Sequence, residues 1–257
     1  MGILVMRDEN DILEEYLTKI TQYYDTILVL DGSSDNEGER ICSQFSEVVF
    51  YEKDNNVISG KINDSIRGFL WEKAKNIVED KEWVAVLHPD EFPEGNPLEM
   101  LEQHKDATSV AICNMHFFLH TSQKDGWSFK PGDLIEPKMK WYMAPGWTEY
   151  RYFKFDRSYK YNNEHGWVIP PQSLGRPVHS NFRHKQFTYR SKDQVLKRAI
   201  TRWESDWQQN DYCLVLETGD IFFDTLKYPE SYAEKYPKQY ALCWYNTPEA
   251  HVARLDD

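Results

Sequence analysis

The sequence predicts an α/β fold with a mostly parallel central sheet and a loop-rich C-terminal half. Over the first 95 residues, short apolar runs alternate with amphipathic helical patterns, an order typical of parallel sheets covered by helices. The apolar runs are continuous rather than alternating, as in strands buried on both faces. Beyond residue 96, prolines, glycines and aromatic residues interrupt this regularity.

The first half of the chain carries the clearest element signals. Ile3–Met6 is a short apolar run, and the helix after it has Asp11 and Glu14 at capping-box spacing. The stretch "TILVL" reads as a second buried strand and leads into the turn "DGSSDNEG". The expected strands are residues 3–6, 26–30, 47–51 and 83–87, and the expected helices are 11–20, 39–45 and 62–77.

The second half is predicted more sparsely. Strands are expected at 109–115 and 151–155, a long loop at 117–147, and a helix at 191–208. We expect one domain of 257 residues, made of a first half at 1–95, a second half at 96–210 and a C-terminal extension at 211–257.

Bulk composition restricts the partners. A net charge of −12 disfavours nucleic acid and anionic membrane surfaces. Four well-separated cysteines indicate neither a zinc site nor a disulfide framework, so a reducing, cytoplasmic location is expected. No apolar run approaches the roughly 20 residues that a membrane span needs.

Acidic side chains follow three of the predicted parallel strands. Glu9 comes after the first, Asp31 and Asp35 after the second, and Asp90 after the fourth. Carboxyl ends of parallel strands meet at one sheet edge, where ligands of open α/β sheets bind. Clustered carboxylates repel one another unless a cation or hydrogen-bond donors relieve the charge. Each acid alone also has a structural explanation, since Asp35 could cap a helix and Asp31 could shape a turn.

The motif pattern favours a metal-assisted diphosphate site. Neither G-x-G-x-x-G nor the P-loop pattern occurs, so a glycine cradle is absent. Mn²⁺ or Mg²⁺ on carboxylates would neutralise a nucleotide diphosphate instead. Arg67, Arg183 and Lys185 are expected to add positive charge there, although the basic stretch from 192 to 202 is better explained as a solvated helix face.

These segments resemble the nucleotide-binding half of family-2-type glycosyltransferases, which have the GT-A fold, a three-layer sandwich. The resemblance rests on "MRDENDILEEYL", "DTILVLDGSSDNEGE" and "WVAVLHPDEFPEG", in this order, and covers roughly residues 3 to 95. A weaker likeness continues in "TEYRYFKF", "EHGWVIPP" and "NFRHKQFTYRSKDQVLKR".

The resemblance implies roles for individual residues. Glu9 and Asp31 would contact the nucleoside, Asp90 would hold the metal and His184 would be a downstream ligand. The D-x-D motif of the family begins with His88 here, which implies that Mn²⁺ is favoured, that Asp90 alone holds the ion, or that metal use is weakened.

The activity implied is transfer of a sugar from a nucleotide-diphosphate donor to an acceptor hydroxyl, such as that of a glycan. Inversion at the sugar would require a carboxylate base. Glu149 is our first candidate on position, with Asp133 and Glu164 behind it. An ion pair between Glu149 and Arg151 explains the same residue without catalysis.

Two other classes remain open. The chain could be a non-catalytic nucleotide-sugar or glycan-binding protein, which the His88 substitution makes worth considering. The stretch "ILVLDGSSD" also resembles the opening of haloacid-dehalogenase-like phosphatases, with Asp31 as nucleophile. That motif requires an Asp where Ser33 stands, so this alternative ranks low.

Overall fold

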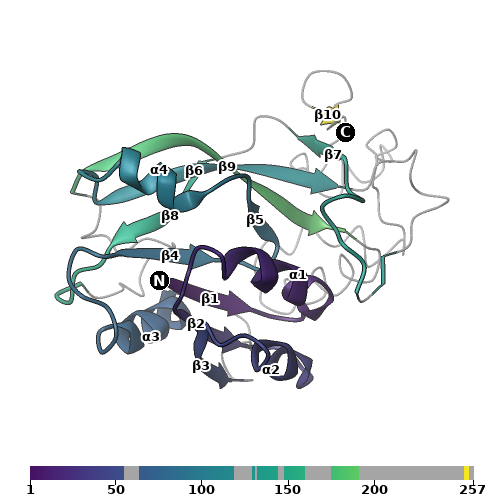
Figure 1. Cartoon of the computed structure of the whole chain (residues 1–257), viewed down its shortest axis with the longest axis horizontal. Coiled ribbons are helices and arrows are strands. Elements are labelled where there is room, and N and C mark those ends of the chain that lie inside the picture. Colours follow the sequence, from purple (N-terminus) through teal and green to yellow (C-terminus); the bar gives the residue numbers. More distant parts are fainter. Residues whose placement is uncertain are drawn as a thin grey trace, which may run out of the picture. The chain divides into compact units, whose positions relative to one another are not determined.

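The computed structural model describes residues 1–54, 64–118, 129–130, 132–143, 148–159, 175–190 and 252–254 (Figure 1). The chain divides into two compact units. The first comprises residues 1–58, 62–114 and 147–185, and the second comprises 59–61, 115–146 and 186–257. The described site residues considered below belong to the first unit, with the exception of Asp133, which lies in the second.

Four parallel strands form the centre of the first unit, and Figure 1 shows them side by side. They are β1 (Gly2–Met6), β2 (Ile27–Asp31), β3 (Val48–Lys53) and β4 (Trp83–Leu87), in the spatial order β3-β2-β1-β4. Met6 pairs with Asp31 and Leu4 with Leu87, so the carboxyl ends of β1, β2 and β4 lie close together.

Antiparallel strands extend the sheet beyond β4. β8 (Thr148–Lys154) pairs antiparallel with β4, and β6 (Ser109–Phe118) pairs antiparallel with β8. The short strand β5 (Glu91–Pro93) pairs instead with β9 (Pro177–Tyr189). The predicted α/β class with a parallel central sheet is confirmed.

Helices cover both faces of the parallel strands. On one face, Leu70, Trp71 and Ala74 of α3 (Asp64–Ala74) pack in a core with Ile3 and its neighbours on β2 and β4. On the other face, α2 (Glu37–Cys42) brings Gly38 against Met6. α1 (Asn10–Ile20) lies beside α2, and its Tyr16 ring meets Phe92 edge-on at 5.3 Å.

The second unit contains its own strand pairs. The end of β6 pairs antiparallel with β7 (Trp141–Met143), which in turn pairs with β10 (Val252–Arg254). Phe117 stacks on Tyr142 at 5.3 Å and packs against Phe187 at 4.9 Å.

Several element boundaries differ from the sequence predictions. α1 begins earlier than predicted, and its N-cap residue Glu9 makes no side-chain cap hydrogen bond, so the capping box of Asp11 and Glu14 is wrong. β7 lies inside the predicted loop, and β9 was not predicted. The expected helix at 191–208 lies outside the described residues, as do Glu164 and the segment 144–147.

α4 (Pro97–Gln103) begins as the Asn-Pro signal indicates. The Asn96 side chain accepts a hydrogen bond from the backbone N–H of Leu98 at 2.9 Å, and Pro97 takes the first helical position. No helix in the described part of the chain combines the length and apolarity that crossing a membrane requires.

Candidate functional site

The loops after β1 and β2 are bonded to each other at the carboxyl edge of the sheet. The backbone N–H of Asp8 donates to the Ser33 hydroxyl at 2.8 Å, and the Asp8 carboxylate accepts from the backbone N–H of Ser34 at 3.2 Å. Asp8 has a φ of 53°, a conformation that Asp tolerates better than most residues. The loops after β1 and β2 therefore lie together, and Glu9, the N-cap residue of α1, follows Asp8 directly.

Asp31 is fully buried, and both its carboxylate oxygens accept hydrogen bonds within the protein. Its Oδ1 accepts from the backbone N–H of Ser33 at 2.7 Å, and its Oδ2 accepts from the Tyr51 hydroxyl at 2.6 Å. These contacts fit the turn-shaping explanation of Asp31. Because Asp31 has no exposed surface, contact with a nucleoside, as the resemblance implies, would require the groups that cover it to move.

Asp35 is exposed and lies before α2. Its Oδ1 accepts from the Asn10 side chain at 2.8 Å and from the backbone N–H of Glu37 at 3.0 Å. The second of these bonds satisfies a donor at the beginning of the helix, as a capping side chain does. The structure thus brings Asp35 to the start of α2 and supports its structural explanation.

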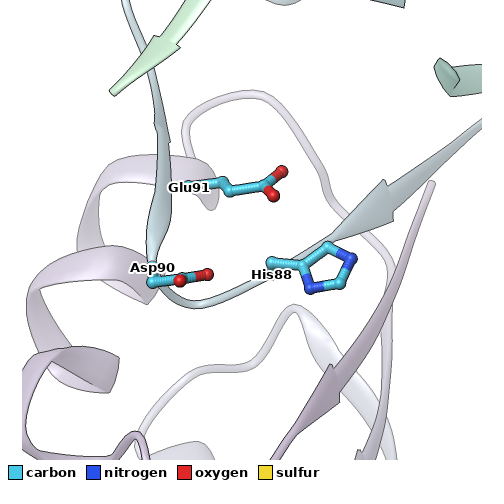
Figure 2. Close-up of side chains that lie close together, drawn as sticks. All are labelled: His88, Asp90 and Glu91. Carbon is cyan, nitrogen blue, oxygen red and sulfur yellow. The ribbon is translucent and has the colours of Figure 1, made fainter. Parts of the chain in front are cut away.

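His88, Asp90 and Glu91 form a cluster immediately after β4, which we call the 88–91 cluster. One candidate ligand atom from each lies within 4.8 Å of the other two. Asp90 and Glu91 are 4% and 2% exposed, and their carboxylates extend toward the side on which the His88 ring lies (Figure 2). An imidazole nitrogen with two carboxylates is a donor set that suits Mn²⁺ better than Mg²⁺.

Arg151 of β8 holds the Glu91 carboxylate. Its Nε donates to Oε2 and its Nη2 to Oε1 of Glu91, both at 2.7 Å, in a buried bidentate ion pair. The same guanidinium contacts the Glu149 carboxylate, which also accepts from Asn114 at 3.4 Å. Glu149 therefore makes the ion pair that the sequence offered as its non-catalytic explanation.

Burial and charge act together on the ionisable groups of the 88–91 cluster. Desolvation on its own would raise the pKa of Glu91, but the charge and hydrogen bonds of Arg151 hold that pKa well below its usual value. Desolvation lowers the pKa of His88 to about 3; Arg151 and Arg67 reinforce this, and Glu91 and Asp90 oppose it. Glu91 is thus ionised and His88 neutral near pH 7.

Arg67 of α3 reaches the 88–91 cluster. Its Nη2 lies 3.2 Å from His88 Nε2, and its side chain is largely buried. Arg67 was expected among the residues that bind the nucleotide sugar, and the structure brings it to His88. Two guanidinium groups, those of Arg67 and Arg151, therefore face a cluster of two carboxylates and an imidazole.

His184 enters the same region from β9 but is held by tyrosines. Tyr24 donates to the Tyr152 hydroxyl at 3.5 Å, which leaves the Tyr152 proton directed at His184 Nε2, 3.0 Å away. The other ring nitrogen, Nδ1, lies 3.8 Å from Glu91 Oε2. His184 borders Glu91, and it does not belong to the ligand group found among the described residues.

Arg183 and Lys185 flank His184 on β9. Successive side chains of a strand point to opposite faces, so His184 faces inward while Arg183 is exposed. Arg183 Nε lies 2.6 Å from Glu94 Oε2 in an ion pair. The structure therefore does not bring Arg183 to the 88–91 cluster, and Lys185 shares the alternate face with Arg183.

Arg151 and Tyr152 are the site residues whose roles sequence reasoning missed. Their burial on β8 follows from the pairing of Tyr152 with Ala85 of β4, which places β8 directly beside the strand that carries the cluster. Arg151 was considered only as a partner of Glu149. Its position between two glutamates could not be recognised without the antiparallel register of β8.

No family model matches the sequence, and no curated protein matches it. A solved structure of 4-diphosphocytidyl-2C-methyl-D-erythritol synthase is 11% identical, with a TM-score of 0.43, covering 70% of this chain and 88% of that one. HddC from Yersinia pseudotuberculosis is 10% identical, with a TM-score of 0.38, and the match covers 72% of this chain and 92% of that one.

A third solved structure is described as a glucose-1-phosphate thymidylyltransferase from Bacillus anthracis in complex with sucrose. It is 12% identical, with a TM-score of 0.37, and the match covers 78% of this chain and 94% of that one. Since folds host many unrelated activities, function has to be argued from the site residues.

Proposed function

We propose that this chain is a glycosyltransferase that moves a sugar from a nucleotide-diphosphate donor to an acceptor hydroxyl, with Mn²⁺ or Mg²⁺ as cofactor. The observation that supports the proposal most strongly is the position of the 88–91 cluster. Three ligand-type side chains lie within 4.8 Å of one another, directly after the parallel strand β4. This is the sheet edge at which α/β proteins bind nucleotides.

Within this proposal, two groups of described residues act on the diphosphate: those that hold the ion and the two arginines beside them. Asp90 and Glu91, with His88 beside them, would hold the ion, whose charge would stabilise the leaving diphosphate. Arg67 and Arg151 keep permanent positive charge next to the same place, in a buried setting where charge is poorly screened. Arg151 also fixes the Glu91 carboxylate, so that its orientation does not depend on the ligand.

Glu149 remains our proposed base for an inverting reaction. Its side chain is 33% exposed, so it can reach solvent and an acceptor while its Oε2 contacts Arg151. Asp133 accepts from Lys138 and from the backbone N–H of Lys130, which lowers its pKa and makes it a poorer candidate.

Two alternatives are separated from this proposal by simple observations. A binding protein that lacks turnover would bind the nucleotide sugar without releasing nucleoside diphosphate. A phosphatase using Asp31 as nucleophile finds no support, because Asp31 is fully buried and both its oxygens accept hydrogen bonds.

The experiment that tests the proposal is a donor screen in two steps. Thermal unfolding is measured with UDP, GDP, CDP and dTDP, each with and without Mn²⁺ or Mg²⁺. A ligand at about a hundred times its dissociation constant adds roughly 2.7 kcal/mol to stability, which is readily seen as a higher melting temperature. The nucleotide that binds then defines which nucleotide sugars are assayed for release of nucleoside diphosphate.

A shift with one nucleotide that grows with Mn²⁺, followed by release of that nucleotide from its sugar conjugate, supports the transferase. Binding without release in the presence of candidate acceptors supports the non-catalytic alternative. If no nucleotide or metal changes the melting temperature, the proposed function is wrong.

A further inference from the structure

The contact between Arg67 and His88 follows from the way α3 crosses the sheet. α3 precedes β4, so it runs back along the strands and its first turn lies at their carboxyl edge. Arg67 stands three and four residues before Leu70 and Trp71, which pack on β1, β2 and β4, and therefore shares their helix face. This spacing directs a long cationic side chain at the residue that follows β4.

The contact fixes where the proton of the His88 ring lies. A guanidinium has hydrogen-bond donors and no acceptor. Because Arg67 Nη2 lies 3.2 Å from His88 Nε2, this nitrogen must accept and is unprotonated. In a neutral imidazole the other nitrogen then carries the hydrogen, so His88 is the Nδ1–H tautomer.

This tautomer has no free lone pair for a metal ion. The Nε2 lone pair is directed at Arg67, and Nδ1 carries a hydrogen. An ion bound by either nitrogen would therefore require Arg67 to leave the ring. An ion at Nε2 would also lie against the guanidinium charge in a buried setting, where repulsion between cations is strong.

We propose that Arg67 and a divalent ion exclude each other at His88, so that His88 becomes a metal ligand only when Arg67 has moved away. Arg67 is thus a specificity-determining residue for the metal: while it contacts His88, an ion in the wild-type cluster is held without the imidazole. This inference rests on the proposed metal role of the 88–91 cluster. It adds that the affinity of the cluster for the ion is limited by the chain's own arginine.

The test is a titration with Mn²⁺ alone, followed by electron paramagnetic resonance, which counts free Mn²⁺. The wild type is compared with Arg67→Met, His88→Ala and the double variant. Arg67→Met keeps an apolar stem but removes the donor and the charge, so it should bind Mn²⁺ about tenfold to a hundredfold more tightly. His88→Ala should leave wild-type affinity unchanged and should abolish the gain in the Arg67→Met background.

Two further variants separate this effect from general loss of positive charge. Arg67→Lys keeps a cationic donor and should retain wild-type Mn²⁺ affinity. Arg176→Met removes an exposed arginine and should change nothing. If His88→Ala weakens Mn²⁺ binding in the otherwise wild-type chain, or if Arg67→Met binds Mn²⁺ no more tightly than wild type, the inference is overturned.

A spectroscopic measurement on the wild type tests the same idea without relying on the folding of Arg67→Met. Long-range ¹H–¹⁵N spectra distinguish protonated from unprotonated ring nitrogens, and His88→Ala identifies the His88 signals. Nδ1 should be protonated and Nε2 unprotonated in the absence of metal. The Nε2–H tautomer would contradict the inference. Neither measurement involves a nucleotide, so both results can be interpreted even if the proposed sugar transfer is wrong.

Discussion

Arg151 donates two parallel hydrogen bonds of 2.7 Å to Glu91, from Nε to Oε2 and from Nη2 to Oε1. The two side chains are 4% and 2% exposed. Glu91 comes from the turn after β4 and Arg151 from the neighbouring strand β8, so the pair ties the candidate site to the sheet. It also compensates a carboxylate that would otherwise be buried without a counter-charge.

Removing either partner alone should destabilise the fold. Arg151→Met leaves Glu91 as a buried carboxylate without its guanidinium and should lower the free energy of unfolding by about 3–5 kcal/mol. Glu91→Gln should cost less, because Arg151 keeps its ion pair with Glu149. Urea unfolding at pH 7 measures this change. Arg40→Met, which breaks the exposed ion pair with Glu37, is the matched control and should change little.

Replacing both partners by apolar residues should be much less harmful than the sum of the single changes. The variant Glu91→Leu with Arg151→Met removes both charges of this pair, so neither is left buried without its partner. If the double variant loses as much stability as both single variants added together, the pair is not the coupled unit described above.

Stability should fall as the pH is lowered from 7.5 to 5. Burial lowers the pKa of His184 below its usual value of 6.5. Below pH 6.5 the unfolded chain binds a proton that the folded chain does not, so the stability present above this pH is progressively lost, by at most about 1.4 kcal/mol per pH unit. His88 acts with the same sign.

The measurement is the free energy of unfolding against pH in EDTA, so that no bound ion contributes. His184→Gln should make the curve flatter without abolishing its slope, because His88 still titrates. Equal slopes in wild type and His184→Gln would refute the assignment of a buried neutral His184.

Asp31→Ala should destabilise the fold, in addition to any effect on ligand binding. Asp31 is fully buried and accepts from the Tyr51 hydroxyl and from the backbone N–H of Ser33, so its loss leaves buried donors without a partner. A loss of about 1–3 kcal/mol is expected by urea unfolding. Tyr51→Phe removes one of these bonds and should lose about 1 kcal/mol. Unchanged stability in Asp31→Ala would show that its hydrogen bonds are not formed.

Gly38→Ala should disturb the same carboxylate from the helix side. A Cβ at this position would lie 2.4 Å from Asp31 Oδ2 and 2.5 Å from Met6 Cε, both far closer than atoms pack. Displacing them should lower stability by about 1–3 kcal/mol. Gly175→Ala is the control, because its Cβ would meet Thr108 at an ordinary 3.7 Å. Equal thermal stability of the two variants would contradict the close approach of α2 to Asp31.

The parallel part of the fold could be predicted because its signals are local. Residues such as Leu28 and Val29 are apolar on both faces of a strand, and that pattern identifies β2 without knowledge of its neighbours. The order of strands and helices then places Asp31 and Asp90 at one sheet edge. The 88–91 cluster was visible in the sequence for the same reason.

β9 was missed because its inward face mixes polar and apolar residues. Ser180 and His184 share that face with Phe182, so no regular alternation of apolar and polar residues appears. The inward side chains are tolerated because partners from elsewhere meet them, as Tyr152 meets His184. Such partners depend on tertiary register, which one sequence does not contain.

The start of α1 could not be predicted from the sequence for a different reason. Asp11 and Glu14 have the spacing of a capping box, but the helix begins at Asn10 and no side-chain cap forms. The chain enters α1 directly from the loop in which Asp8 is hydrogen-bonded to Ser33, a tertiary contact between residues 25 positions apart that one sequence does not contain.

The most direct test of the account is calorimetric titration of nucleoside diphosphates in Mn²⁺ with wild type, Asp90→Asn and Asp106→Asn. Asp90 is buried in the 88–91 cluster, whereas Asp106 is exposed after α4, so the two changes remove the same charge at different places. The account predicts that wild type and Asp106→Asn bind one nucleoside diphosphate equally and that Asp90→Asn loses this binding. Equal binding by all three proteins would contradict the placement of the diphosphate at the cluster.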